Sequence, residues 1–206
     1  MSKEDFYCTI EKGAVAEFKD RGSKFIAYAC PVRDTDECKE RLNEIKKEHP
    51  KATHHCFAYR IGLDGNAFRV SDDGEPSGSA GRPILGQIDS KSLVNVLIVV
   101  VRYFGGTLLG VPGLINAYKS AAALALQMTP QVQRPVEKEM VLQFDYTQVN
   151  DVMTLAKQYN CRILQQEMQL FCRITLAIPR NRLTEVTYKL KELRNVEMHQ
   201  AGLDVR

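Results

Sequence analysis

Three carboxylates stand within four positions of a polar stretch of the 206-residue chain: Asp72, Asp73 and Glu75. Carboxylate oxygens are the ligands that hard cations such as Mg²⁺ prefer, and a bound cation can polarise a water molecule. The same residues can instead accept backbone hydrogen bonds and shape a turn, and the later oxygen ligands of an EF-hand loop are missing. The cluster therefore predicts either a divalent-cation site or a structured turn.

A second reactive segment is the run His54-His55-Cys56, at the start of a stretch of alternating polarity. In an extended chain His54 and Cys56 face one side and His55 faces the other, so that one histidine can project toward a site while the other packs. A thiol beside an imidazole can act as a nucleophile, although positions two apart on a strand seldom give the right geometry without a third group. Three roles stay open: a nucleophilic Cys56, a histidine in a polar or metal site, and structural histidines.

The third segment is a glycine-rich turn that follows Arg102 and contains Gly105 and Gly106. Glycines let backbone N–H groups approach an anion, and a guanidinium can grip a phosphate with two hydrogen bonds. The spacing matches neither a Walker loop nor a GxGxxG fingerprint, and the glycines can equally serve close packing of a helix on a strand. If the segment binds an anion, we expect further basic side chains to join it: Lys24, Arg82 and Lys119.

The pattern of apolar residues predicts the elements that hold these segments. Strands are predicted over 6–10, 24–31, 56–61, 67–70 and 93–103. The last of them is apolar enough to lie at the centre of a covered sheet. Helices are predicted from a capping box at Asp34 to about His49, over 83–88 and over 114–128. Because functional loops sit at the ends of rigid strands, we expect the loops at 54–56, 71–83 and 102–113 to converge on one side of the sheet.

The C-terminal third has a clear order of elements. Strands are predicted over 136–146, 161–169, 170–178 and 196–205, with helices over 148–159 and 181–193. This β-α-β-β-α-β order is that of ferredoxin-like domains. The segment 129–135 holds two prolines and lacks periodicity, so it is predicted to be a linker between two domains, 1–130 and 136–206.

Two long motifs resemble the signature of the IMPACT family, including its bacterial YigZ-like members. They are SDDGEPSGSAGRPIL at 71–85 and VVVRYFGGTLLGVPGLINAY at 99–118, and THHCFAYR at 53–60 and Ser23-Lys24-Phe25 also fit. The resemblance implies an α+β fold. Its N-terminal domain would be similar to the second domain of ribosomal protein S-five and to domain four of the translocation elongation factor, and its C-terminal domain would be ferredoxin-like. Both relatives touch RNA, but a shared fold is weak evidence for a shared function.

The composition limits the classes of function. With 28 basic and 25 acidic side chains, the formal net charge is only +3, which excludes a histone-like nucleic-acid binder but leaves room for a local basic patch. The six cysteines contain no CxxC pair, so zinc-ribbon and thioredoxin motifs are absent. The sequence shows no signal peptide, and no apolar run approaches the ~18 residues of a membrane span. We therefore expect a cytoplasmic protein with reduced thiols and no membrane partner.

Two functions fit these observations. The first is a nucleic-acid- or ribosome-associated binding protein that regulates translation, in which basic and glycine residues contact the phosphates of RNA: Lys24, Arg82, Arg102, Gly105, Gly106 and Lys119. The alternative is a metal-assisted hydrolase that uses His54 or His55 with Asp72, Asp73 and Glu75. No complete catalytic set can be named, so the sequence favours binding. No cofactor is expected apart from a divalent cation in the acidic loop, and the oligomeric state stays open.

Overall fold

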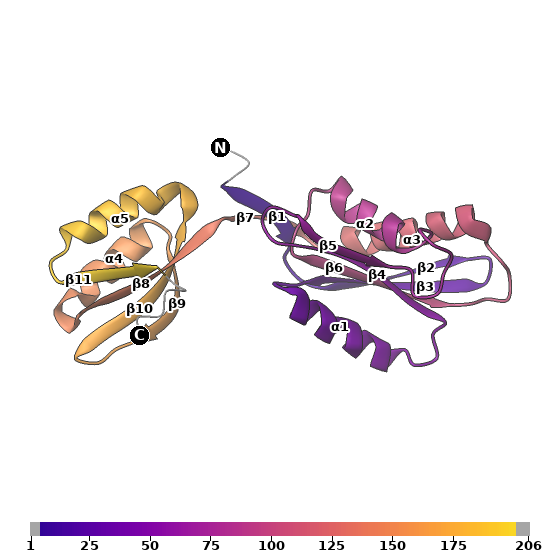
Figure 1. The fold of residues 1–206 in the computed structure, drawn as a ribbon, viewed down its shortest axis with the longest axis horizontal. Helices are drawn as coiled ribbons and strands as arrows, with labels where there is room; N and C mark the ends of the chain where they lie inside the picture. The colour runs from indigo at the N-terminus through magenta and orange to yellow at the C-terminus, as the bar shows by residue number, and fades with distance from the viewer. Residues whose placement is uncertain (1–4, 201–206) are drawn as a thin grey trace. The chain divides into compact units, whose positions relative to one another are not determined.

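The computed structural model describes residues 5–200, which divide into two compact units (Figure 1). One unit comprises Tyr7–Arg134, and the other comprises Asp5 and Phe6 together with the residues from Pro135 onward. Helices and strands occur in both units, which confirms the expected α+β class. We propose that the two units are the two domains expected from the sequence. Among the described residues, no helix has both the length and the apolar character needed to cross a membrane.

The larger unit is built on an antiparallel five-stranded sheet in the order β2-β3-β6-β4-β5. Its strands are β2 (Ala14–Asp20), β3 (Ser23–Pro31), β4 (His54–Ile61), β5 (Ala67–Ser71) and β6 (Val96–Tyr103). β6 is the central strand, and every residue from Val96 to Arg102 is buried. A strand covered on both faces cannot alternate with polar residues, which is why its sequence is continuously apolar.

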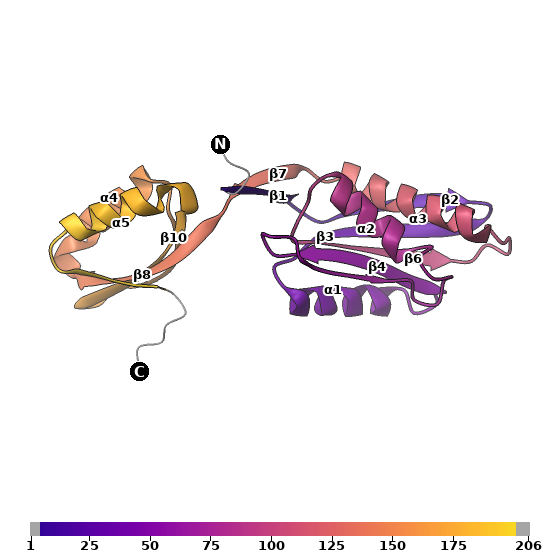
Figure 2. The ribbon, with the colours of Figure 1, turned by 45° about the horizontal axis from the view of Figure 1, so that its top comes forward.

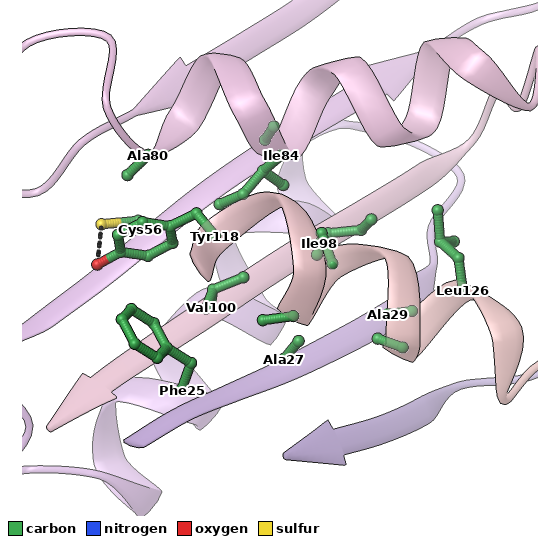
Figure 3. Packing of buried hydrophobic residues seen from close by; sticks show 14 of the residues in the cluster. Phe25, Ala27, Ala29, Cys56, Ala80, Ile84, Ile98, Val100, Tyr118 and Leu126 are labelled. Atoms are coloured by element: carbon green, nitrogen blue, oxygen red, sulfur yellow. Dashed lines mark hydrogen bonds between the residues drawn. The ribbon is translucent and has the colours of Figure 1, made fainter. Parts of the chain in front are cut away.

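Helices cover both faces of this sheet (Figures 1 and 2). α2 (Gly81–Ser90) and α3 (Gly110–Gln127) pack on one face, and α1 (Thr35–Glu48) packs on the other. Alternate residues of β6 serve the two cores, so Val100 contacts the first and Val99 the second. Figure 3 shows part of the first core. The alanines of α3 in this core, Ala117, Ala121, Ala122 and Ala125, are small enough to let the helix lie close to the sheet.

The expected start of α1 is confirmed by its cap. The carboxylate of Asp34 accepts hydrogen bonds from the backbone N–H groups of Asp36 and Glu37, at 3.0 and 2.8 Å. The helix ends at Glu48, with His49 as its C-terminal cap. An N-terminal cap of this kind satisfies N–H groups that have no partner within the helix.

Several boundaries differ from those predicted. The sequence pattern missed β2, an edge strand in which no residue is fully buried and apolar and polar residues do not alternate regularly. α3 begins at Gly110, four residues earlier than expected, because Pro112 in the first turn needs no backbone N–H bond. The central strand begins at Val96 and not at residue 93, because Asn95 turns the chain with a φ of 59°. The segment after Thr129 is not an irregular linker: β7 (Gln131–Pro135) pairs with β1 (Phe6–Ile10).

The smaller unit has the ferredoxin-like arrangement predicted from its order of elements. Its elements are β8 (Glu137–Asp145), α4 (Val149–Gln158), β9 (Arg162–Glu167), β10 (Phe171–Pro179), α5 (Leu183–Glu192) and β11 (Val196–Gln200). The strands form an antiparallel sheet in the order β11-β8-β10-β9, and α4 and α5 cover one of its faces (Figure 2). The part of the last strand expected beyond residue 200 lies outside the described residues.

The loop that follows β6 crosses the turn between β2 and β3 at backbone distance. The N–H of Gly105 donates to Ser23 Oγ at 3.2 Å, and a Cβ atom on Gly105 would lie only 1.9 Å from the carbonyl carbon of Gly22. Gly106 has a φ of 86°, in the left-handed region that favours glycine. A close backbone approach therefore explains Gly105, but it is the approach of a loop to a turn and not the expected packing of a helix on a strand. The crossing fixes where the loop at 104–109 begins.

This crossing gives a direct test of loop placement. Gly105→Ala should lower the free energy of unfolding by about 3 kcal/mol or more, because two backbones must move apart. The matched control is Gly86→Ala, since nothing lies within 4 Å of a Cβ at that helical position. The control should raise stability by about 0.5–1 kcal/mol, which is the helix preference of alanine over glycine. Urea unfolding of the two variants measures both values, and equal effects would contradict the crossing.

Candidate binding site

The three reactive segments meet at one end of the five-stranded sheet. His54, the first residue of β4, stands directly opposite Arg102 in the register of β4 and β6. The loop between β5 and α2 reaches the same place, since the carbonyl oxygen of Asp73 lies 2.7 Å from His54 Nδ1. Segments as far apart in the sequence as His54 and Arg102 are thus neighbours in the structure.

A buried ion pair joins these segments. Arg102 Nη1 donates to Glu75 Oε1 at 2.5 Å, and the two side chains are only 6% and 4% exposed. The hydroxyl of Tyr118, on α3, donates to the same carboxylate oxygen at 2.8 Å. The rings of Phe25 and Phe104 flank the guanidinium, with centroids 5.5 and 5.6 Å from its carbon. The charge of Arg102 is therefore balanced within the protein, and this side chain is not an exposed grip for phosphate.

One donor of this guanidinium has no partner. Arg102 Nε is buried and makes no hydrogen bond, and it is the one such side-chain nitrogen or oxygen among the described residues. Arg102 Nη2 reaches only Ser23 Oγ, at 3.4 Å. Buried polar atoms are nearly always satisfied in native proteins, so this unpaired donor is an exception within the ion pair.

His54 is held in one tautomer by the loop. Its Nδ1 must carry the proton, because the neighbouring Asp73 oxygen is a carbonyl and can only accept. In the neutral form of the ring the lone pair is then on Nε2, which lies 3.8 Å from Glu75 Oε1. The imidazole is thereby an oriented hydrogen-bond acceptor next to a carboxylate.

The three clustered carboxylates have different partners. Asp72 accepts from the backbone N–H groups of Gly78, Ala80 and Gly81 at 2.8–3.0 Å. Burial alone would raise the pKa of Asp72, but these donors and the nearby Arg82 outweigh it and hold the pKa below its usual value. Asp73 Oδ2 instead accepts from the backbone N–H of His55, at 2.6 Å. The turn-forming alternative therefore describes both residues.

A metal site is not assembled here. Within residues 5–200, no three His, Cys, Asp or Glu side chains gather closely enough to hold a metal ion. The carboxylate of Glu75 is directed to Arg102 and not to the two aspartates. The hydrolase alternative therefore has no support from the geometry.

Cys56 and His55 have structural surroundings. The Sγ atom of Cys56 lies 3.3 Å from the Tyr118 hydroxyl within the core (Figure 3), and burial raises the pKa of this thiol to about 12. A neutral thiol at pH 7 is a poor nucleophile. His55 faces the opposite side of the sheet, where its Nε2 lies 3.1 Å from the carbonyl oxygen of His49, and desolvation lowers its pKa. The predicted alternation of the two histidines is what the structure has.

The expected basic residues do not form one patch. Lys24 pairs with Tyr103 across β3 and β6, one position from the Phe25–Arg102 pair, so its side chain projects from the other face of the sheet. There it contacts Glu17 at 2.6 Å. Arg82 and Lys119 are exposed on α2 and α3, the helices that cover the face of Arg102. Two of the three expected basic residues, Arg82 and Lys119, are thus exposed on the face of the sheet that carries the site.

A cavity of about 350 Å³ lies above the ion pair. Its polar residues are Thr53, His54, Glu75 and Arg102, and apolar residues supply the rest: Pro76, Phe104, Leu108, Leu109, Val111 and Leu114. Leu108 is 83% exposed, which is unusual for a leucine and places it at the rim. An apolar cavity with a few convergent polar groups is the usual form of a ligand site.

Sequence reasoning missed Tyr118, Phe104 and Leu108. Tyr118 has a detectable signal, because it is a lone hydroxyl on the buried stripe of a helix whose other members are small or aliphatic. Phe104 and Leu108 carry no such signal, since their importance comes from the path of the loop. Tyr118 is fully buried and bonds to both Glu75 and Cys56.

Comparisons with known proteins agree with this fold. The Impact N-terminal domain model matches residues 21–126, which include every segment that forms the cavity. The chain is 35% identical over 173 residues to the IMPACT family member YigZ of Escherichia coli K12, covering 82% of this chain and 84% of that one. The chain belongs to the IMPACT family.

Two solved structures resemble this IMPACT family member. A crystal structure described as that of a hypothetical protein is 28% identical, with a TM-score of 0.74, and the match covers 95% of this chain and 97% of the other. A structure described as the two-domain translational regulator Yih1 is also 28% identical, with a TM-score of 0.39 over 58% of this chain and 48% of the other. The family likeness and the first of these structures extend over both units of the chain.

The ion pair predicts a large loss of stability on truncation. Arg102→Ala should lower the free energy of unfolding by about 3–5 kcal/mol, because Glu75 would be left as a buried, unpaired carboxylate. The matched control is Arg41→Ala, since Arg41 pairs with Glu44 at 2.9 Å but both side chains are more than half exposed. The control should change stability by less than about 0.5 kcal/mol. Chemical unfolding compares the two, and a small effect at Arg102 would contradict the buried pair.

Proposed function

We propose that this protein is a cytoplasmic nucleic-acid- or ribosome-associated binding protein that regulates translation, and that the cavity above Arg102 is its binding site. The observation that carries this proposal is the cavity of about 350 Å³, with an apolar rim, above the buried ion pair of Arg102 and Glu75. An apolar cavity with a few convergent polar groups is the usual form of a ligand site.

The chemistry of the site supports binding over catalysis. The thiol of Cys56 is neutral at pH 7, and the carboxylates of Asp72 and Asp73 bind backbone N–H groups. A nucleophile and a base within hydrogen-bond reach of one another are the usual mark of a catalytic site. Here Cys56, Asp72 and Asp73 are hydrogen-bonded to other groups of the protein and form no such pair, so the arrangement is suited to recognition.

Phosphate contacts would come from the exposed basic residues and not from Arg102. Arg82 and Lys119 are exposed on the helices that flank the cavity, and Lys119 follows Val111 and Ile115 at helical spacing on α3. Eight residues of helix span about 12 Å, which is therefore the distance along α3 from Val111 at the cavity to Lys119. An RNA chain of a few nucleotides can reach both. Contacts of this kind position an RNA chain without reading its sequence.

The salt dependence of association tests the proposal. Ribosome co-sedimentation and filter binding of single-stranded RNA should both weaken as salt rises, because phosphate contacts release counterions. Lys119→Ala and Arg82→Ala should each weaken binding and reduce the slope of log K against log salt by about 0.7–1.

The matched control for these variants is Lys39→Ala. Lys39 is an exposed lysine on α1, which covers the opposite face of the sheet, and it should change neither the affinity nor the slope. If the wild-type protein shows no salt-dependent association with RNA or ribosomes, the proposal is wrong.

A further inference from the structure

The polar side of the cavity is electrically balanced but rich in hydrogen-bond acceptors. Glu75 and Arg102 cancel each other's charge, and His54 is held with its proton on Nδ1. Glu75 Oε1 accepts from both Arg102 and Tyr118, whereas Oε2 makes no hydrogen bond to any described residue. Glu75 Oε2 and His54 Nε2 are therefore two open acceptors that line the same cavity.

We propose that this cavity binds a single unstacked nucleobase that carries an exocyclic amino group, packed against Phe104 and donating to Glu75 and His54. The inference rests on the proposed function and names the part of the RNA that the site recognises. The two hydrogens of an amino group match the two open acceptors. Carboxylates accept from cytosine N4 in this way in nucleic-acid complexes.

The balanced charges of Arg102 and Glu75 favour an uncharged ligand. A phosphate would meet Glu75 beside Arg102, and an ammonium group would meet Arg102 beside Glu75, so neither ion gains from the pair as a whole. A nucleobase is uncharged at neutral pH. Its ring can occupy the apolar part of the cavity while its edge faces the acceptors.

The open acceptors also exclude a purely aliphatic occupant. A leucine or valine side chain from a protein partner would cover Glu75 Oε2 and His54 Nε2 and leave both without donors. Burying acceptors without donors opposes binding. Uracil is a poorer fit than cytosine for a similar reason, because its carbonyl oxygens would lie against the same acceptors.

The size and the rim of the cavity suit a base that leaves the RNA stack. A volume of about 350 Å³ is at the lower end for ligand pockets, so it suits one ring system and not a large cofactor. Phe104 is 46% exposed at the rim, where a base can stack on it. Unstacked bases held on aromatic side chains are the usual way in which proteins read single-stranded RNA.

Oligonucleotides of equal length test the inference, because they carry equal numbers of phosphates. By fluorescence anisotropy at fixed salt and pH 7.5, the wild-type protein should bind a 15-nucleotide oligo(C) about tenfold more tightly than oligo(U). Phe104→Ala should weaken oligo(C) binding about tenfold while leaving the salt slope unchanged.

The matched control is Phe68→Ala. Phe68 is 55% exposed and packs against Arg60, much as Phe104 packs against Arg102, but it lies on β5 and outside the cavity. It should leave both affinities unchanged. Glu75→Gln, which replaces an open acceptor with an amide donor, should reduce or reverse the preference for oligo(C); circular dichroism checks that this variant is folded.

Each outcome decides the inference. Equal affinity for oligo(C) and oligo(U), or equal effects of Phe104→Ala and Phe68→Ala, would overturn it. If binding without base preference remains sensitive to salt and to Lys119→Ala, the proposed function stands and only the base pocket fails. If neither oligonucleotide binds and an apolar peptide binds at Phe104 instead, the site recognises protein and both proposals fail.

Discussion

The buried contact between Arg102 and Glu75 is the interaction on which the rest of the site depends. The desolvation free energy of two buried charges exceeds their mutual attraction unless the geometry is good and further hydrogen bonds are made. Here Tyr118 supplies one such bond, and the rings of Phe25 and Phe104 flank the guanidinium. The pair therefore requires β6, the loop after β5 and α3 to be in place together.

This constraint also decides what the site can do. Because Glu75 balances its charge, Arg102 is poorly suited to bind a phosphate. The cavity above it presents hydrogen-bonding groups that carry no net charge together. The acidic loop that resembles a metal site in the sequence is a folded turn in which Asp72 and Asp73 accept hydrogen bonds from backbone N–H groups and Glu75 pairs with Arg102. Recognition of a neutral, donor-bearing group is the chemistry that remains.

The sequence predicted the fold well because its signals are local. Continuous apolar character marked β6, the cap at Asp34 marked α1, and the alternation of strands and helices marked the ferredoxin-like unit. The candidate site was harder. A pattern identifies Glu75 and Arg102 as polar, but their pairing depends on tertiary structure. The same holds for Lys24, which the strand register turns to the other face, and for Phe104 and Leu108, whose loop is placed by the Gly22–Gly105 crossing.

Zero-length ultraviolet crosslinking of a single-stranded RNA to the full chain, read by mass spectrometry, tests the central claim most directly. An RNA base held in the cavity is in contact with Phe104 and lies beside Thr53 and His54. The account predicts nucleotide adducts on peptides that contain Phe104 or the Thr53–His54 pair, and their loss when excess oligo(C) competes. Adducts confined to β8 and β10 of the ferredoxin-like unit, with none in these peptides, would contradict it.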